Sequence, residues 1–238
     1  MKAILSSFRV FIRQIIRDDM LWAVCLAPFL AGLFFRFAIP AIDRWLAQTF
    51  DGGLLLAEYY LLFDLMLNLL TPYMFCFAAA MVMLTEYDEN IAVYMAITPV
   101  GKSGYILSRL MIPAGLAVPA GLMVTALFSL TVWSIDRLIV VSLLSGLLSL
   151  AVALLVVSFS NNRVEGMALA KLSGLLMMGL PVPFFIVSNH QYWFSALPSF
   201  WIARLSVGQN YIYSLPAAIT SVIWILILYR KFERKLSR

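Results

Sequence analysis

Residues 138–158 read LIVVSLLSGLLSLAVALLVVS, an uncharged stretch in which almost every side chain is apolar. About 20 apolar residues are what an α-helix needs to cross a hydrocarbon core roughly 30 Å thick. The whole 238-residue chain is 63% apolar and only 12% charged, whereas soluble domains average about 45–50% and about 25%. The composition therefore excludes a water-soluble enzyme and predicts an all-α polytopic membrane protein.

Six apolar blocks of this kind predict six transmembrane helices that together form one transmembrane domain over residues 20–229. Their expected ranges are 20–39, 59–84, 110–132, 138–158, 166–187 and 210–229. Ala117 and Gly121, four residues apart, predict a close contact between helices. Prolines inside the spans should bend or break them, and these are Pro72, Pro113, Pro119, Pro181 and Pro183.

Residues 1–19 precede the first span and have a pattern of their own. Apolar residues repeat at helical spacing, while Arg9, Arg13 and Arg17 recur every four residues on another face. The pattern predicts a basic amphipathic helix in the membrane surface, and the alternative is a solvated charged lead-in. A cleavable signal peptide is not expected, because its apolar region should follow a short basic stretch directly.

Basic residues are distributed unequally between the two sides of the predicted bundle. Thirteen of the 17 Lys and Arg residues fall on the side of the two termini, and the other side carries Arg36, Arg44, Arg137 and Arg204. The positive-inside rule therefore predicts that both termini are cytoplasmic, with residues 230–238 as a basic tail. Topology and anionic lipid headgroups account for the net charge of +5, so no nucleic-acid partner is expected.

Two connections on the opposite side are longer than a simple turn. Residues 41–58 carry Asp43, Asp51 and Glu58. Residues 188–209 concentrate Tyr, Trp and Phe around Pro198, which is the composition of an interfacial aromatic belt. We expect the second connection to dip into the outer leaflet.

The sequence lacks the usual constellations of catalytic or metal-binding residues. His190 is the only histidine, which excludes a Ser-His-Asp arrangement and a His-rich metal site. Residues 96–103, AITPVGKS, nearly match the nucleotide-binding pattern GxxxxGK[ST]. However, Ala96 replaces the first glycine, Pro99 removes an amide donor, and the stretch lies between membrane spans. We therefore expect no catalytic residue, metal or cofactor on this chain.

The longest gap on the side of the termini, residues 85–109, is the most informative region. Glu86, Asp88 and Glu89 precede a short helical pattern that Pro99 ends, and negative charge is favourable at a helix N-terminus. A short helix with an acidic start and an apolar face predicts a surface that another protein contacts. The alternative is a helix that rests on the membrane interface.

Two stretches of the chain resemble ABC-2 type transporter permeases. Residues 85–109, TEYDENIAVYMAITPVGKSGYILSR, carry an acidic residue, a Thr-Pro pair, and a downstream tyrosine and basic residue. In that family these residues frame the coupling helix. Residues 162–171, NRVEGMALAK, followed by Pro181 and by LPSFW at 197–201, are similar to the fourth-to-sixth-span region of compact drug and peptide exporters, which include fluoroquinolone-export permeases.

The resemblance implies a half-transporter in a bacterial plasma membrane that exports an amphipathic drug, lipid or peptide. Two six-span chains, either two copies or this chain and a paralogous permease, would pack face to face. Each would bind a separate ABC ATPase, which carries the ATP and Mg²⁺. Residues 1–19 would match the interfacial helix of the family, and residues 188–209 its re-entrant outer hairpin. The resemblance implies coupling to the ATPase for Glu86, Asp88, Glu89, Tyr94, Thr98, Pro99, Tyr105, Arg109, Arg163 and Glu165.

A polar stripe on the second predicted span is the candidate substrate path. Asp64, Asn68 and Thr71 are spaced i, i+4 and i+7, and a carboxylate inside a membrane span is a functional candidate by default. The alternative is that the span begins at Leu65 and that Asp64 lies among the outer headgroups.

Other classes of membrane protein fit the sequence less well. A substrate-capture subunit of a vitamin-uptake ABC system would need no acidic coupling helix of its own. A self-contained secondary transporter or channel should show ionisable residues at the midplane and often an inverted repeat, whereas the charges here gather at the ends of the spans. A membrane-embedded enzyme would need a matched acid, base, nucleophile or metal set.

Overall fold

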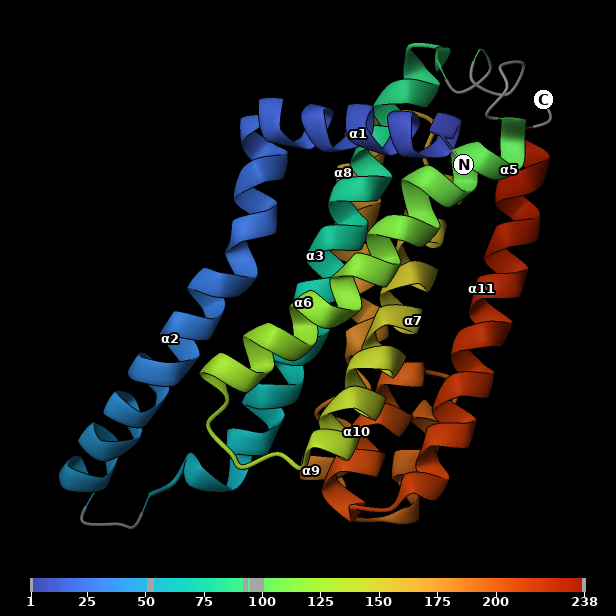
Figure 1. The fold of residues 1–238 in the computed structure, drawn as a ribbon. Coiled ribbons are helices and arrows are strands. Elements are labelled where there is room, and N and C mark those ends of the chain that lie inside the picture. The colour runs from blue at the N-terminus through green and yellow to red at the C-terminus, as the bar shows by residue number, and fades with distance from the viewer. Residues whose placement is uncertain (1, 51–53, 92–93, 95–100, 237–238) are drawn as a thin grey trace.

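The computed structural model describes residues 2–50, 54–91, 94 and 101–236. Every regular element among these residues is helical. In the described part of the chain, six helical segments are long and apolar enough to cross a membrane: Asp19–Thr49, Ala57–Asp88, Gly104–Phe128, Ile135–Phe159, Arg163–Phe185 and Tyr211–Lys235. The predicted all-α, six-span architecture is therefore confirmed (Figure 1).

The amphipathic helix α1 (Lys2–Arg17) lies across the ends of the spans, at the end of the bundle where both termini are found (Figure 1). We call this end the terminal face and the opposite end the distal face. Phe11 on α1 is buried against the bundle, whereas Arg9, Arg13 and Arg17 are exposed. Asp18 then accepts a hydrogen bond from the amide of Leu21 and caps α2 (Asp19–Thr49), so the chain turns from the surface into the first span. The predicted amphipathic helix is confirmed, and its position in the membrane surface stays a prediction.

The centre of the bundle is formed by α3 (Tyr60–Asp88) and α7 (Ile135–Phe159), which are largely buried and pack along each other. The helix α6 (Ile112–Phe128) packs against both of them, while α2 and α11 (Ser214–Leu236) lie at opposite edges of the bundle (Figure 1). A Cβ atom at Gly121 of α6 would lie 3.3 Å from Pro72 Cδ and 3.4 Å from the carbonyl oxygen of Asn68 on α3. The small residue therefore permits the close helix contact that the sequence predicts.

The first span extends beyond its predicted end and continues through Pro40 to Thr49. Asp43 was expected in the following loop, but it lies within α2 and is fully buried. Its carboxylate accepts hydrogen bonds from the amide of Leu56 and the hydroxyl of Tyr60, both at 2.9 Å. Asp43 thereby fixes the short 3₁₀ turn η1 (Ala57–Tyr59) and the start of α3.

The fifth span is broken into pieces rather than continuous. It comprises α8 (Arg163–Ser173), the 3₁₀ turn η3 (Gly174–Met177) and α9 (Val182–Phe185). Pro181 and Pro183 lack amide donors, which accounts for the loss of regular helix there. A Cβ atom at Gly179 would lie 2.5 Å from the amide nitrogen of Phe200, so glycine is required for the approach of the following helix.

The connection after the fifth span, predicted as a loop that dips into the outer leaflet, is helical. It contains η4 (Asn189–Phe194) and α10 (Pro198–Gly208), and the sixth span then begins with η5 (Tyr211–Tyr213). The helix α10 enters the distal end of the bundle and packs against α7, α9 and α11. Phe200 and Ile202 on α10 are buried there.

Candidate functional site

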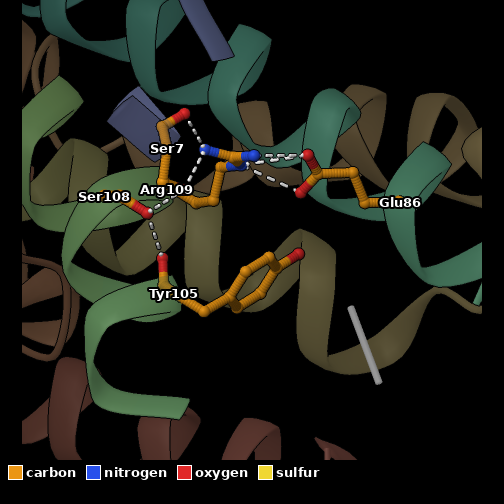
Figure 2. Close-up of polar contacts among 5 residues, drawn as sticks. All are labelled: Ser7, Glu86, Tyr105, Ser108 and Arg109. Carbon is orange, nitrogen blue, oxygen red and sulfur yellow. Dashed lines mark hydrogen bonds and ion pairs between the residues drawn. The ribbon is translucent and has the colours of Figure 1, made fainter. Parts of the chain in front are cut away.

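A buried arginine at the terminal face holds several elements together. The guanidinium of Arg109 donates from Nε to both carboxylate oxygens of Glu86, at 3.1 and 2.9 Å, and from Nη2 to Oε1 at 2.7 Å. Its Nη1 donates to the carbonyl oxygen of Ser7 at 2.7 Å and to the Ser7 hydroxyl at 3.0 Å. The Arg109 and Glu86 side chains are each 1% exposed. Figure 2 shows the guanidinium between the carboxylate and Ser7.

The surroundings of the guanidinium are aromatic and hydroxyl groups from α1 and from the start of the third span. The Phe11 and Tyr105 ring centres lie 5.5 and 5.9 Å from Arg109 Cζ, within the range of cation–π attraction. The Ser108 hydroxyl donates to the carbonyl oxygen of Tyr105 at 3.0 Å (Figure 2). We call Ser7, Glu86, Tyr105, Ser108 and Arg109 the Arg109 cluster.

The Arg109 cluster draws its residues from separate elements of the fold. Ser7 comes from α1 and Glu86 from the last turn of α3. Tyr105 belongs to α5 (Gly101–Ile106), and Arg109 belongs to the π-helical segment η2 (Leu107–Met111) that leads into α6. Short π-helical segments occur frequently at functional sites. The cluster thus ties both ends of the long gap between the second and third spans to the interfacial helix.

The position of Glu86 corrects one expectation from the sequence. Glu86 was predicted to begin an exposed contact helix, but α3 continues through Asp88 and Glu86 is buried with Arg109. Asp88, Glu89 and Tyr94 are exposed, whereas Tyr105 is buried. Thr98 and Pro99, the remaining predicted residues of this helix, lie outside the described residues. Of the predicted contact residues in the described part of this region, Asp88, Glu89 and Tyr94 are therefore the ones whose side chains are available for contact.

Arg163 and Glu165, for which the resemblance also implies contact with the ATPase, lie at the start of α8. Glu165 accepts a hydrogen bond from the amide of Asn161 at 2.7 Å, and its own amide donates to the Asn162 side chain at 2.9 Å, in the manner of a helix cap. Arg163 forms an ion pair with Asp18 at 2.5 Å. The hydrogen bond from Arg163 lowers the pKa of the Asp18 carboxyl below its ordinary value.

The predicted polar stripe lies in the contact between α3, α6 and α7. The amide nitrogens of Leu130 and Thr131 donate to the Asp64 carboxylate at 2.7 and 2.9 Å, and the indole of Trp133 donates to it at 3.1 Å. These bonds explain why α6 ends at Phe128 rather than at the expected residue 132. Asp64 is 1% exposed within the protein, and its predicted place on a substrate path or at the depth of the outer headgroups stays a prediction.

Asn68 and Thr71 are likewise satisfied within the bundle. The Asn68 amide donates to the hydroxyls of Thr125 and Ser142 at 3.0 and 2.8 Å, and its carbonyl accepts from Ser145 at 2.9 Å. The Thr71 hydroxyl donates to a backbone carbonyl of its own helix. Both residues are fully buried. The stripe therefore joins three spans, and its predicted role as substrate path stays a prediction.

A cavity that the sequence did not reveal lies on another face of α3. It has a volume of about 360 Å³ and an almost wholly apolar lining from α2, α3 and the broken fifth span. Sites for drug-sized ligands typically measure roughly 300–1,000 Å³, and methionine side chains adapt to ligands of different shape. We call it the apolar cavity; the lining includes Phe35, Met66, Leu70, Met177, Met178 and Pro181.

Comparison with known proteins decides the family. The family described as fluoroquinolones export permease protein Rv2686c-like matches residues 11–229. The chain belongs to this family. Two relatives from Mycobacterium tuberculosis are the fluoroquinolones export permease proteins MT2760 (strain CDC 1551 / Oshkosh) and Rv2686c (strain ATCC 25618 / H37Rv). Each is 28% identical to the chain over 244 residues, which cover 98% of this chain and 95% of the relative.

Membership of the Rv2686c-like family confirms the resemblance to compact ABC-2 type permeases. The matched range includes the apolar cavity and all of the Arg109 cluster except Ser7. The sequence offered one signal for the cluster, because Glu86 and Arg109 are opposite charges at the two edges of one gap between spans. It offered little for the cavity, whose shape depends on the break in the fifth span.

Proposed function

We propose that this chain is the membrane-spanning permease subunit of an ATP-binding cassette exporter that removes amphipathic drugs from a bacterial cell. The observation that carries the proposal is the family match over residues 11–229. The two curated relatives are named as fluoroquinolones export permease proteins, and the chain aligns with 95% of each of them. The apolar cavity supports it, because its volume and methionine-rich lining suit a drug-sized apolar or amphipathic molecule. A lipid or an apolar peptide would suit the same lining.

In this proposal, the terminal face is cytoplasmic and lies at the bacterial plasma membrane. The unequal distribution of basic residues supports this orientation. A separate ATPase, which binds the ATP and Mg²⁺, docks on the region 85–109 through exposed residues such as Asp88 and Tyr94. A second copy or a paralogous permease packs against the first, and the apolar cavity opens towards the path between them.

In this proposal, the Arg109 cluster transmits movement of the ATPase to the transmembrane helices. Glu86 and Arg109 flank the docking region, and their ion pair joins α3 to the start of the third span. Ser7 joins both to α1. Closure of the ATPase pair on ATP would therefore move α1, α3 and α6 together, and the bundle would pass between its two arrangements.

The docking step is tested by co-purification of the tagged chain with its ATPase in mild detergent. The change Asp88→Lys with Tyr94→Ala should reduce the amount of bound ATPase, because both side chains are exposed in the proposed contact. Asp136→Lys, an exposed carboxylate at the distal face, is the matched control. Reversing Glu86 would not test docking, since it would break a buried ion pair.

Three outcomes would contradict this function. Wild-type binding by the Asp88→Lys, Tyr94→Ala variant would reject the docking surface. An ATPase that arrives only with a membrane scaffold other than a paralogous permease would favour a vitamin-capture subunit. A folded preparation without any ATPase would favour a secondary transporter or channel.

The substrate site is tested by filling the apolar cavity. Gly174 lines it, and a Cβ atom there would meet no other atom within 4 Å. Gly174→Phe should therefore leave the fold intact and lower the export rate of a fluorescent fluoroquinolone by about ten-fold or more. Gly115→Phe on α6, where a Cβ atom also meets open space, is the control and should export normally. Equal export by both variants would remove the cavity from the path.

A further inference from the structure

A second cavity, on the terminal face, is charged rather than apolar. It has a volume of about 320 Å³ and lies where the junction of α1 and α2 meets the end of α3 and the start of α8. We call it the charged cleft; its polar lining is Gln14, Arg17, Asp18, Thr85, Glu89 and Arg163. The predicted placement of the amphipathic helix α1 in the membrane surface puts the cleft at the depth of the lipid headgroups.

The cations and anions in the charged cleft are only partly neutralised by each other. Arg163 and Asp18 form an ion pair at 2.5 Å, and Asp18 also caps α2. Arg17 and Glu89 form no ion pair or side-chain hydrogen bond with another described residue. Among the described residues, the cleft therefore offers one cation and one anion without a partner, which together complement a zwitterion.

Hydrogen-bond acceptors in the cleft indicate what kind of cation it would hold. The Gln14 side-chain oxygen is buried and accepts no hydrogen bond from any described residue. The Thr85 hydroxyl donates to the carbonyl oxygen of Met81 at 3.1 Å, which leaves its oxygen lone pairs free to accept. Together with the Glu89 carboxylate these groups can accept three hydrogen bonds. A primary ammonium supplies three donors, whereas a quaternary ammonium supplies none.

The remaining lining indicates the rest of the ligand. The guanidinium of Arg17 suits a phosphate, to which it can donate two parallel hydrogen bonds. Leu21 and Val82 form an apolar part of the wall, as the glycerol and acyl end of a membrane lipid would require. A phosphate and a primary ammonium separated by two carbons form the phosphoethanolamine headgroup.

We propose that the charged cleft binds the phosphoethanolamine headgroup of a membrane lipid, with the phosphate on Arg17 and the ammonium on Gln14, Thr85 and Glu89. This site is independent of the proposed export function, because it rests on the cleft and on the membrane placement of α1. The bound lipid would fix α1 against α3 and α8 at the surface.

The test is native mass spectrometry of the full-length chain released from vesicles that contain equal amounts of phosphatidylethanolamine, phosphatidylcholine and phosphatidylglycerol. The wild-type chain should retain phosphatidylethanolamine in preference to the other two lipids. Arg17→Gln and Glu89→Gln should each lower this preference by roughly five-fold, the effect of losing one partly exposed charge interaction. The matched controls are Arg13→Gln on the same helix and Asp88→Asn beside Glu89, which are exposed and do not line the cleft.

Equal retention of phosphatidylethanolamine and phosphatidylcholine by the wild-type chain would overturn the proposal. So would variants in the cleft that behave like their controls while unfolding at the wild-type temperature. A competition arm uses soluble glycerophosphoethanolamine. Displacement of the lipid by this compound at equal concentration would overturn the membrane lipid as the source, whereas retention of the lipid would support it.

Discussion

Arg109→Met should lower the free energy of unfolding by about 3–5 kcal/mol, since it would leave the Glu86 carboxylate buried without its cation. Arg109→Lys should lose a large part of the same stability. A lysine ammonium cannot donate side by side to Glu86 and also reach Ser7 as the planar guanidinium does. Both losses would be measured as a drop in the unfolding temperature of the purified chain, followed by tryptophan fluorescence.

The double variant Glu86→Met, Arg109→Met is the control for this prediction. It removes both charges, and replacing a buried ion pair by apolar residues of similar size is often neutral. It should therefore be more stable than Arg109→Met alone, although the Ser7 carbonyl would still lack its donor. A single variant as stable as the double variant would contradict the view that the pair is buried and mutually dependent.

Asp64→Asn should destabilise the protein by about 2–3 kcal/mol. In the wild-type chain two backbone amides donate to the two oxygens of the Asp64 carboxylate, and the asparagine side chain would replace one of these acceptors by an NH₂ donor. The loss should be greatest in the connection between α6 and α7, where Leu130, Thr131 and Trp133 donate to Asp64. Hydrogen exchange at residues 129–134 should become faster than in the wild-type chain, and the unfolding temperature should fall.

Asp136→Asn provides the comparison, since Asp136 is an exposed carboxylate at the start of α7. It should change neither the exchange at residues 129–134 nor the unfolding temperature by much. If Asp64→Asn also left the exchange and the unfolding temperature unchanged, Asp64 would not stabilise this connection, and a role in a substrate path would be favoured.

The sequence predicted the spans well because hydropathy and helix length are properties of single segments. It failed where a polar side chain is satisfied by a distant partner. Asp43 was expected in a loop because the first apolar block ends at Ile39, yet the amide of Leu56 and the hydroxyl of Tyr60 stabilise it within α2. For Asp64, the sequence did not reveal that backbone amides of the connection between α6 and α7 donate to its carboxylate.

The candidate site was predicted by region rather than by geometry. Charge pattern indicated residues 85–109, but it could not separate Glu86, which is buried, from Asp88, which is exposed. The difference arises from helix phase, because α3 continues through this region and turns Glu86 towards Arg109. The apolar cavity depends on how the broken fifth span packs beside α2 and α3, and that packing is a tertiary property.

The hydrogen bond between Ser7 and Arg109 has a consequence for how the chain is made. Ser7 leaves the ribosome 102 residues before Arg109, so two spans enter the membrane before its partner exists. During that interval α1 can pack only against α2 and α3. The earliest helix to be synthesised therefore gains its hydrogen bonds to Arg109 only when the third span arrives, and correct placement of that span completes the attachment of the amino terminus.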